Sequence, residues 1–178
     1  MVAIRIGFVS RREEESVLLA ERLMDEIESW NSGVQILADG DLALTIGRPP
    51  SSVQEMERLK VDFIVSIGGD GTILRTIHKM ADPVPILGIN MGTLGFLVDV
   101  EPADALETIK RLLSGFVVDE RSRLKLLLNG VCMPRATNEI AFLTASPAKM
   151  IEFEILVDGS LMEDFRADGV IIATATGS

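Results

Sequence analysis

The sequence has few of the residues that build many common functional sites. Its 178 residues include one cysteine, Cys132, and one histidine, His78. A single cysteine cannot form an internal disulfide or a cysteine-rich zinc site, and a single histidine excludes most histidine-based metal sites and disfavours a Ser-His-Asp triad. We therefore expect both residues to have ordinary packing or surface roles, in a reducing, cytoplasmic setting.

Basic residues and long apolar runs are also scarce. The chain has 17 Lys and Arg against 27 Asp and Glu, a formal net charge of −10. Such an acidic balance argues against binding to nucleic acid and against binding to an anionic membrane surface. No segment approaches the roughly 18 consecutive apolar residues of a membrane helix. The apolar N-terminus contains Arg5 and runs directly into charged residues, so it reads as a buried strand and not as a targeting signal.

Hydrophobic residues are abundant, at 47% of the chain, and they are arranged in two different patterns. In the first part, short apolar runs alternate with amphipathic stretches, which is typical of parallel strands joined by crossover helices. We expect strands at 4–10, 34–38, 61–67 and 85–90, and helices at 16–30, 52–60, 72–80 and 103–113, with Ser16 and Ser52 as N-caps.

After Arg121 the pattern changes to one strand after another. The dipeptides Asn129-Gly130 and Asp158-Gly159 follow the apolar runs 123–128 and 151–157, and both are strong hairpin signals. The sequence therefore predicts an α/β fold class: an N-terminal open parallel-sheet α/β domain at 1–116, followed by an antiparallel β domain at 117–178.

The segment Gly68-Gly69-Asp70-Gly71-Thr72 lies between an expected buried strand and a helix start. Backbone N–H groups and the helix dipole converge on an anion at such a place. A carboxylate beside a phosphate site binds a metal ion, accepts a hydroxyl proton or orients a donor, so Asp70 suggests phosphoryl transfer to an alcohol. The alternative is an ordinary glycine-rich turn with Asp70 as the helix N-cap. The segment matches neither a Walker A loop nor the three-glycine dinucleotide fingerprint.

Three further segments carry polar residues at strand ends. The segment 90–96 follows the next parallel strand, so it is expected at the same sheet edge as Asp70; the alternative is a simple connection with Phe96 in the core. Asn138-Glu139 offers an amide for a base edge and a carboxylate for a ribose diol, or is only a surface strand end. The segment 166–178, taken alone, reads as a strand leaving a turn.

Taken together and in this order, these segments resemble the NAD kinase family. The matching residues are Gly68–Thr72 with Leu74-Arg75, Gly88–Leu97, Asn138-Glu139, Met150–Glu154, and Arg166–Gly169 continuing into Thr174–Ser178. Phosphofructokinases and lipid kinases share the first segment but not the later ones. A lipid or sugar kinase would therefore leave Asn138-Glu139 and 166–178 unexplained.

The resemblance implies transfer of the ATP γ-phosphoryl group to the 2′-hydroxyl of the adenosine ribose of NAD, giving NADP. It also implies a divalent metal, Mg or Mn, with polyphosphate as another donor, and a homodimer or homotetramer. Asp70 would accept the proton. The implied ligand-binding residues are Gly68, Gly69, Gly71 and Thr72 near phosphate, Arg75 at the NAD diphosphate, Asn138 and Glu139 at the adenosine, and Phe96, Lys149, Arg166, Asp168 and Thr176 at other parts of the dinucleotide.

The chain departs from the family pattern in its last residues. The family turn usually reads Thr-Pro-Thr-Gly-Ser-Thr-Ala-Tyr, whereas here Ala175 replaces the proline and the sequence stops at Ser178. We therefore expect an incomplete β domain. Two hypotheses stay open: an NAD kinase, and a catalytically inactive nucleotide-binding fragment of such an enzyme.

Overall fold

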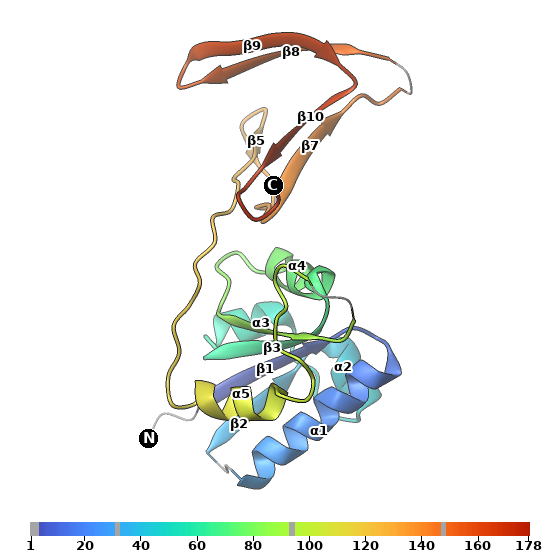
Figure 1. Ribbon diagram of the computed structural model, residues 1–178, viewed down its shortest axis with the longest axis vertical. Coiled ribbons are helices and arrows are strands. Elements are labelled where there is room, and N and C mark those ends of the chain that lie inside the picture. Colours follow the sequence, from blue (N-terminus) through green and yellow to red (C-terminus); the bar gives the residue numbers. More distant parts are fainter. Residues whose placement is uncertain (1–3, 31–32, 93–94, 147–148) are drawn as a thin grey trace. The chain divides into compact units, whose positions relative to one another are not determined.

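A computed structural model describes residues 4–30, 33–92, 95–146 and 149–178 of the chain (Figure 1). The chain divides into two compact units, Met1–Asp119 and Glu120–Ser178. Each unit is described by itself below.

Unit 1 is built around a four-stranded parallel sheet with the strand order β2-β1-β3-β4. Its strands are β1 (Ile4–Ser10), β2 (Val34–Ala38), β3 (Phe63–Gly68) and β4 (Ile86–Asn90). The helices are α1 (Glu14–Trp30), α2 (Gly40–Thr45), α3 (Val53–Arg58), α4 (Asp70–His78) and α5 (Ala105–Leu112). This alternation confirms the predicted α/β class. The order of the strands reverses between β1 and β3, and crevices outside the carboxyl ends of strands at such a point are the usual ligand sites of open α/β sheets.

Helices cover both faces of this sheet, and β3 is buried along its whole length. Because neighbouring strand residues point to opposite faces, Phe8 and Ile67 pack in one apolar cluster with α1 and α5, whereas Ile64 packs in a second cluster with Met56 of α3. Burial of each large apolar side chain stabilises the fold by about 1.5–3 kcal/mol. The buried central strands therefore hold the ends of the loops that follow them in fixed positions.

Two local expectations for unit 1 concern the N-caps of helices. Ser52 is the N-cap of α3, as predicted, and its hydroxyl accepts a hydrogen bond from the Glu55 backbone N–H at 3.1 Å. Ser16 is not an N-cap: α1 already begins at Glu14, and the buried Ser16 hydroxyl accepts from Arg11 Nε at 3.1 Å. The helix α2 was not predicted.

Unit 2 consists of antiparallel strand pairs. Its strands are β5 (Leu127–Leu128), β6 (Val131–Cys132), β7 (Glu139–Leu143), β8 (Ile151–Val157), β9 (Ser160–Ala167) and β10 (Gly169–Ala173), paired as β5-β6, β7-β10 and β8-β9. The two predicted hairpins are confirmed, because Asn129 and Asp158 both adopt φ of 50° and are followed by glycines at 82° and 80°, as type I′ turns require. The predicted strand at 123–128 is shortened to its last two residues.

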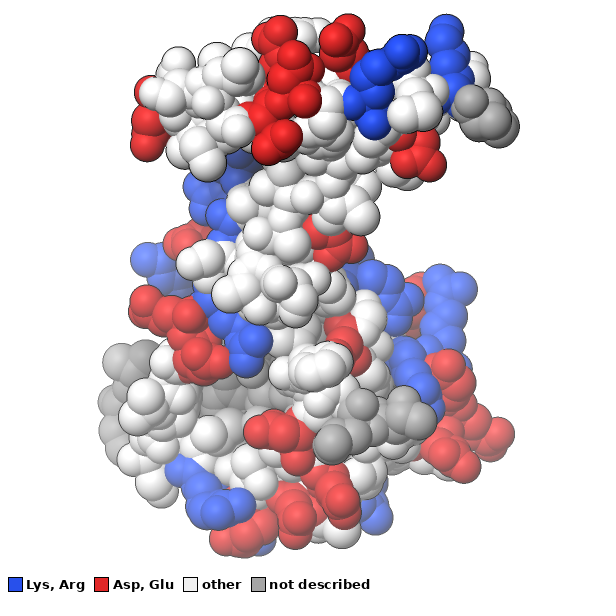
Figure 2. All heavy atoms as spheres, turned by 45° about the horizontal axis from the view of Figure 1, so that its top comes forward, with Lys and Arg blue, Asp and Glu red and all other residues white. Residues whose placement is uncertain are grey.

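Charged side chains of both signs are interspersed on the face in Figure 2, with acidic residues gathered over β8 and β9. The acidic residues in these two strands are Glu152, Glu154, Glu163 and Asp164. Among the residues that the structure describes, none of the helices has the length and apolar composition needed to cross a membrane.

Candidate active site

The turn from β3 into α4 forms the centre of the candidate site. Gly68 ends the strand with φ of 157°, and a side chain there would overlap the Thr72 hydroxyl. Gly69 is the N-cap of α4, and the Thr72 backbone N–H donates to its carbonyl oxygen at 2.9 Å. The first N–H groups of a helix have no partner within the helix, so this turn presents donors to an anion.

Asp70 is the first residue of α4 and not its N-cap, which corrects the alternative interpretation of this turn. Its carboxylate accepts two backbone hydrogen bonds from a distant loop: Phe96 N–H donates to Oδ2 at 2.8 Å, and Leu97 N–H donates to Oδ1 at 3.0 Å. An ionised carboxylate has about four lone-pair sites. With respect to the described residues, two of them therefore remain for a ligand hydroxyl or a cation.

The loop after β4 lies beside this turn, as its position at the sheet edge predicted. The Met91 backbone N–H donates to the Gly68 carbonyl at 3.0 Å, and Arg11 Nη2 donates to the Met91 carbonyl at 2.8 Å. Thr93 and Leu94 of the predicted segment lie outside the described residues. Phe96 is 91% exposed, so the alternative that placed it in the core is wrong.

The positively charged guanidinium of Arg75 lies against the same turn. Its Nε donates to the Gly71 carbonyl at 3.3 Å and its Nη2 to the Thr72 hydroxyl at 3.4 Å, both in the first turn of α4. A cation is disfavoured at this positive end of the helix dipole. A bound anion would interact favourably with both the dipole and the guanidinium, so the arrangement suits a phosphate group.

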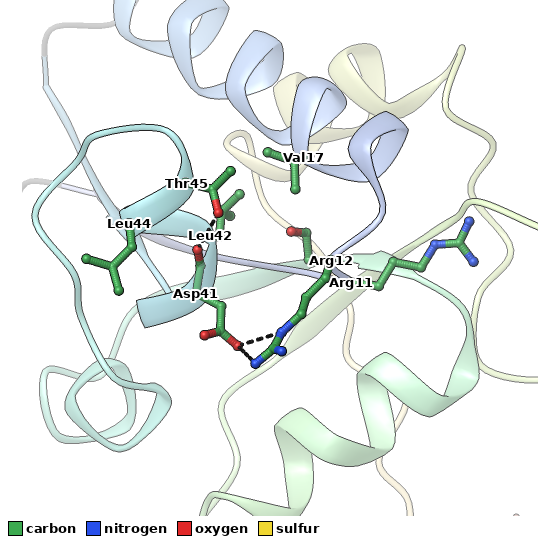
Figure 3. A pocket seen from close by; sticks show the side chains of 8 residues that line it. Arg11, Arg12, Val17, Asp41, Leu42, Leu44 and Thr45 are labelled. Atoms are coloured by element: carbon green, nitrogen blue, oxygen red, sulfur yellow. Dashed lines mark hydrogen bonds and ion pairs between the residues drawn. The ribbon is translucent and has the colours of Figure 1, made fainter.

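A shallow pocket lies at the carboxyl end of β1, which is the strand next to β3 in the sheet (Figure 3). Arg12 and Asp41 line it and form an ion pair at 2.8 Å, and Leu42 and Val17 supply apolar lining. Sequence reasoning did not single out Arg11 or Arg12 as functional residues. Their position directly after a parallel strand is the sequence signal that could have placed them at this edge.

In unit 2 the structure brings Asn138 together with the turn near Ser178. The Thr174 backbone N–H donates to the Asn138 carbonyl at 2.8 Å, and its hydroxyl donates to the Thr137 carbonyl at 2.6 Å. The Asn138 Oδ1 atom is buried and has no hydrogen-bond partner among the described residues. Glu139 begins β7 and is exposed. An unpaired buried acceptor of this kind suits a donor group on a ligand.

Of the remaining predicted residues of unit 2, Thr176 lies in the turn that contacts Asn138, and the other three lie apart from this contact. Arg166 of β9 pairs in register with Glu152 of β8, Asp168 separates β9 from β10, and Lys149 precedes β8; all three predicted residues are exposed. The Thr176 hydroxyl accepts from Arg121 Nη1 at 3.5 Å.

The described residues contain no cluster of three or more His, Cys, Asp or Glu side chains that would hold a metal ion. Asp70 is the acidic residue within the glycine turn. Mg²⁺ is commonly bound through one or two carboxylates together with substrate phosphates. The residues present therefore fit an ion that is held mainly by a nucleotide's own phosphates, and do not fit a cage built by the protein.

Comparison with known proteins assigns the family. Residues 6–117 match the family model described as the ATP-NAD kinase N-terminal domain, and residues 137–178 match the ATP-NAD kinase C-terminal domain. The chain belongs to the ATP-NAD kinase family. The resemblance noted in the sequence is thereby confirmed.

Relatives and solved structures of this family agree with the assignment. The chain is 49% identical to the NAD kinase of Methanosarcina mazei over 98% of its own length and 60% of that protein, and 44% identical to the NAD kinase of Pyrococcus abyssi over 98% and 64%. It is similar to the crystal structure of an NAD kinase from Archaeoglobus fulgidus in complex with ATP, with a TM-score of 0.74 and 34% identity, covering 98% of this chain and 62% of that one.

A yeast NADH kinase complexed with NADH has the same fold, with a TM-score of 0.85 at 22% identity, over 99% of this chain and 59% of that chain. The chain therefore spans about 60% of the length of the relatives it matches.

Proposed function

We propose that this chain carries the catalytic and nucleotide-binding residues of an NAD kinase, which transfers the γ-phosphoryl group of ATP to the 2′-hydroxyl of the adenosine ribose of NAD. The observation that carries the proposal is the placement of Asp70 in the first turn of α4, beside the glycine turn and with two lone-pair sites left after its contacts with Phe96 and Leu97. The named NAD kinases among the relatives support the same activity.

The chemistry needs a proton acceptor and charge neutralisation more than covalent participation of the protein. A bond forms between the ribose 2′-oxygen and the γ-phosphorus, the bond from that phosphorus to the β–γ bridging oxygen breaks, and ADP leaves. Asp70 takes the hydroxyl proton. Backbone N–H groups at Gly69–Gly71 and the Arg75 guanidinium stabilise negative charge on phosphate oxygens. A bound Mg²⁺ or Mn²⁺, held mainly by the nucleotide phosphates, would supply further neutralisation.

Asn138 is proposed to bind the adenine ring. A buried acceptor that lacks a partner costs about 1–3 kcal/mol, and its Oδ1 is such an atom among the described residues. The exocyclic amino group of adenine is a donor that would satisfy it. The exposed Glu139 carboxylate is suited to accept hydrogen bonds from ribose hydroxyls.

The other predicted residues are each proposed to contact the dinucleotide. Phe96 offers an exposed aromatic face to the dinucleotide. Lys149 and Arg166 are proposed to contact its phosphates, and Asp168 and Thr176 its hydroxyl or amide groups. The chain is also proposed to form a homodimer or homotetramer, which native mass spectrometry tests directly.

The activity is tested by a coupled assay of NADP formation from NAD and ATP. The assay is run on the 178-residue chain and on a version extended to the relatives' full length, with polyphosphate replacing ATP in a parallel series. Calorimetric titration with NAD and with ATP is measured on both versions. Turnover by the 178-residue chain supports the kinase. Turnover by the extended version alone supports the alternative, that the 178 residues are a catalytically inactive nucleotide-binding fragment of an NAD kinase. Binding without turnover in both versions identifies a non-catalytic nucleotide-binding module. The absence of both binding and turnover in both versions refutes the proposal.

A further inference from the structure

The loop after β4 touches Asp70 at a residue that has no side chain. Gly95 lies so close to the Asp70 carboxylate that an added Cβ would overlap Oδ1 and lie 2.7 Å from Cγ and 2.9 Å from Oδ2. The two residues that follow Gly95 are the ones whose backbone N–H groups donate to that carboxylate, at 2.8 and 3.0 Å. A side chain at this position is incompatible with the observed placement of Asp70.

We propose that Gly95 is a positioning residue for Asp70. By leaving room for the carboxylate, it lets the Phe96 and Leu97 N–H groups fix the orientation of both oxygens, so that the lone pairs that remain face the ribose hydroxyl. The inference rests on the proposed function, because it assigns to this loop the orientation of the proton acceptor.

The described backbone before and after Gly95 is held in place. It is tied to the strand ends by the Met91 N–H to Gly68 carbonyl bond at 3.0 Å and by the Arg11 to Met91 carbonyl bond at 2.8 Å. On the other side, Val98 is buried, with 1% of its surface exposed. The Asp70 side chain has only two rotatable bonds and is partly exposed, so it moves more easily than the anchored backbone.

An added methyl group is therefore expected to displace the carboxylate and leave the fold intact. Misplacing a reacting group by about 1 Å costs roughly 100-fold in rate. Substrate binding by Arg75 and by the glycine turn does not require the Asp70 carboxylate to keep its orientation. The substitution Gly95→Ala should then lower kcat and leave the KM values for NAD and ATP nearly unchanged.

The test compares Gly95→Ala with Gly92→Ala, which adds the same methyl group to the same loop. At Gly92 the nearest atom to the added Cβ is Arg11 Nη1 at 4.0 Å. In whichever version of the chain turns over, we expect kcat to fall roughly 100-fold for Gly95→Ala, and less than about threefold for Gly92→Ala, with KM changes below about threefold in both. A wild-type kcat in Gly95→Ala overturns the proposal, as does an equal loss in both variants.

A double variant separates positioning from general damage. If Gly95 acts only through Asp70, then adding Gly95→Ala to Asp70→Asn does not reduce the residual rate any further. A full additional loss, multiplying the two single effects, contradicts the proposal.

Amide hydrogen exchange provides a readout that is independent of kinase activity. On the 178-residue chain, the Phe96 and Leu97 amides should be protected, and should exchange faster in Asp70→Ala and in Gly95→Ala but not in Gly92→Ala. Unprotected amides in the wild-type chain, or amides unchanged in Asp70→Ala, overturn the inference even if the chain is an NAD kinase. If the amides respond as expected but neither the 178-residue chain nor its extended version turns over, the proposed function is refuted and the Gly95 contact with Asp70 is still established.

Discussion

Replacing Asp70 with Asn separates the chemical role of this residue from its role in the fold. Asparagine has nearly the same shape but is a poor proton acceptor, so the ribose hydroxyl loses its base. General base catalysis contributes roughly 100-fold to 10,000-fold in rate. We expect kcat to fall by that factor, which corresponds to about 2.7–5.5 kcal/mol of transition-state stabilisation.

The effect of Asp70→Asn on stability is expected to be much smaller. The wild-type carboxylate accepts one N–H from Phe96 and one from Leu97. The Asn side chain keeps an oxygen for one of these donors and turns an NH₂ group toward the other. One hydrogen bond to a charged group contributes about 1.5–3 kcal/mol when it is protected from water, and because the Phe96 contact is exposed, a loss of about 1 kcal/mol is expected.

Both quantities are measured on the same preparations. Steady-state rates from the coupled NADP assay give kcat and KM, and urea denaturation followed by circular dichroism gives the free energy of unfolding. A turnover number within threefold of the wild type would refute the assignment of Asp70 as the base. A loss of activity accompanied by several kcal/mol of destabilisation would instead show that the residue serves the fold.

Three other substitutions test the rest of unit 1. Arg75→Ala should raise the KM for the nucleotide substrates roughly 10-fold, since a charged hydrogen bond to phosphate is lost; an unchanged KM in steady-state kinetics would place the guanidinium outside the site. Ile67→Ala, in the fully buried β3, should lower the free energy of unfolding by about 2–5 kcal/mol in urea denaturation. Arg48→Met should cost about 1 kcal/mol, because Arg48 pairs with Glu28 and Asp25 at 2.6 and 2.7 Å. The hydrogen bond to Glu28 raises the pKa of Arg48 above its ordinary value. Arg48 is therefore protonated, and its ion pairs contribute fully to stability, at any pH below that ordinary value. The destabilisation caused by Arg48→Met should consequently not vary between about pH 7 and 9.

Strands and hairpins were predicted closely because their signals are local. The expected strands at 4–10 and 34–38 match β1 and β2, and Asn129-Gly130 adopts the turn that its sequence favours. The helix α2 has six residues and begins with Gly40, so it is too short for hydrophobic periodicity to indicate it. Asp39, its N-cap, is of a residue type favoured at that position and was the available signal. The helix α1 begins two residues before the predicted start at Ser16, because acidic residues such as Glu14 suit the first turn of a helix.

The site could be predicted in its residue types but not in its contacts. Asp70 and the glycine turn were located by their position between a buried strand and a helix. The hydrogen bond from Phe96 to Asp70 joins residues 26 positions apart, and that from Arg11 to Met91 joins residues 80 positions apart. No local pattern reports such contacts, because they depend on how β1, β3 and β4 are ordered in the sheet.

The acidic balance of the chain determines which forces act at this site. A net charge of −10 does not attract an anionic nucleotide from a distance, and at physiological ionic strength charges beyond about 8 Å are largely screened. Recognition at the glycine turn must therefore come from short-range donors, namely backbone N–H groups and Arg75. Such donors act only when their geometry is held within a fraction of an ångström. A single methyl group beside Asp70 should consequently affect turnover more than the reversal of a distant surface charge.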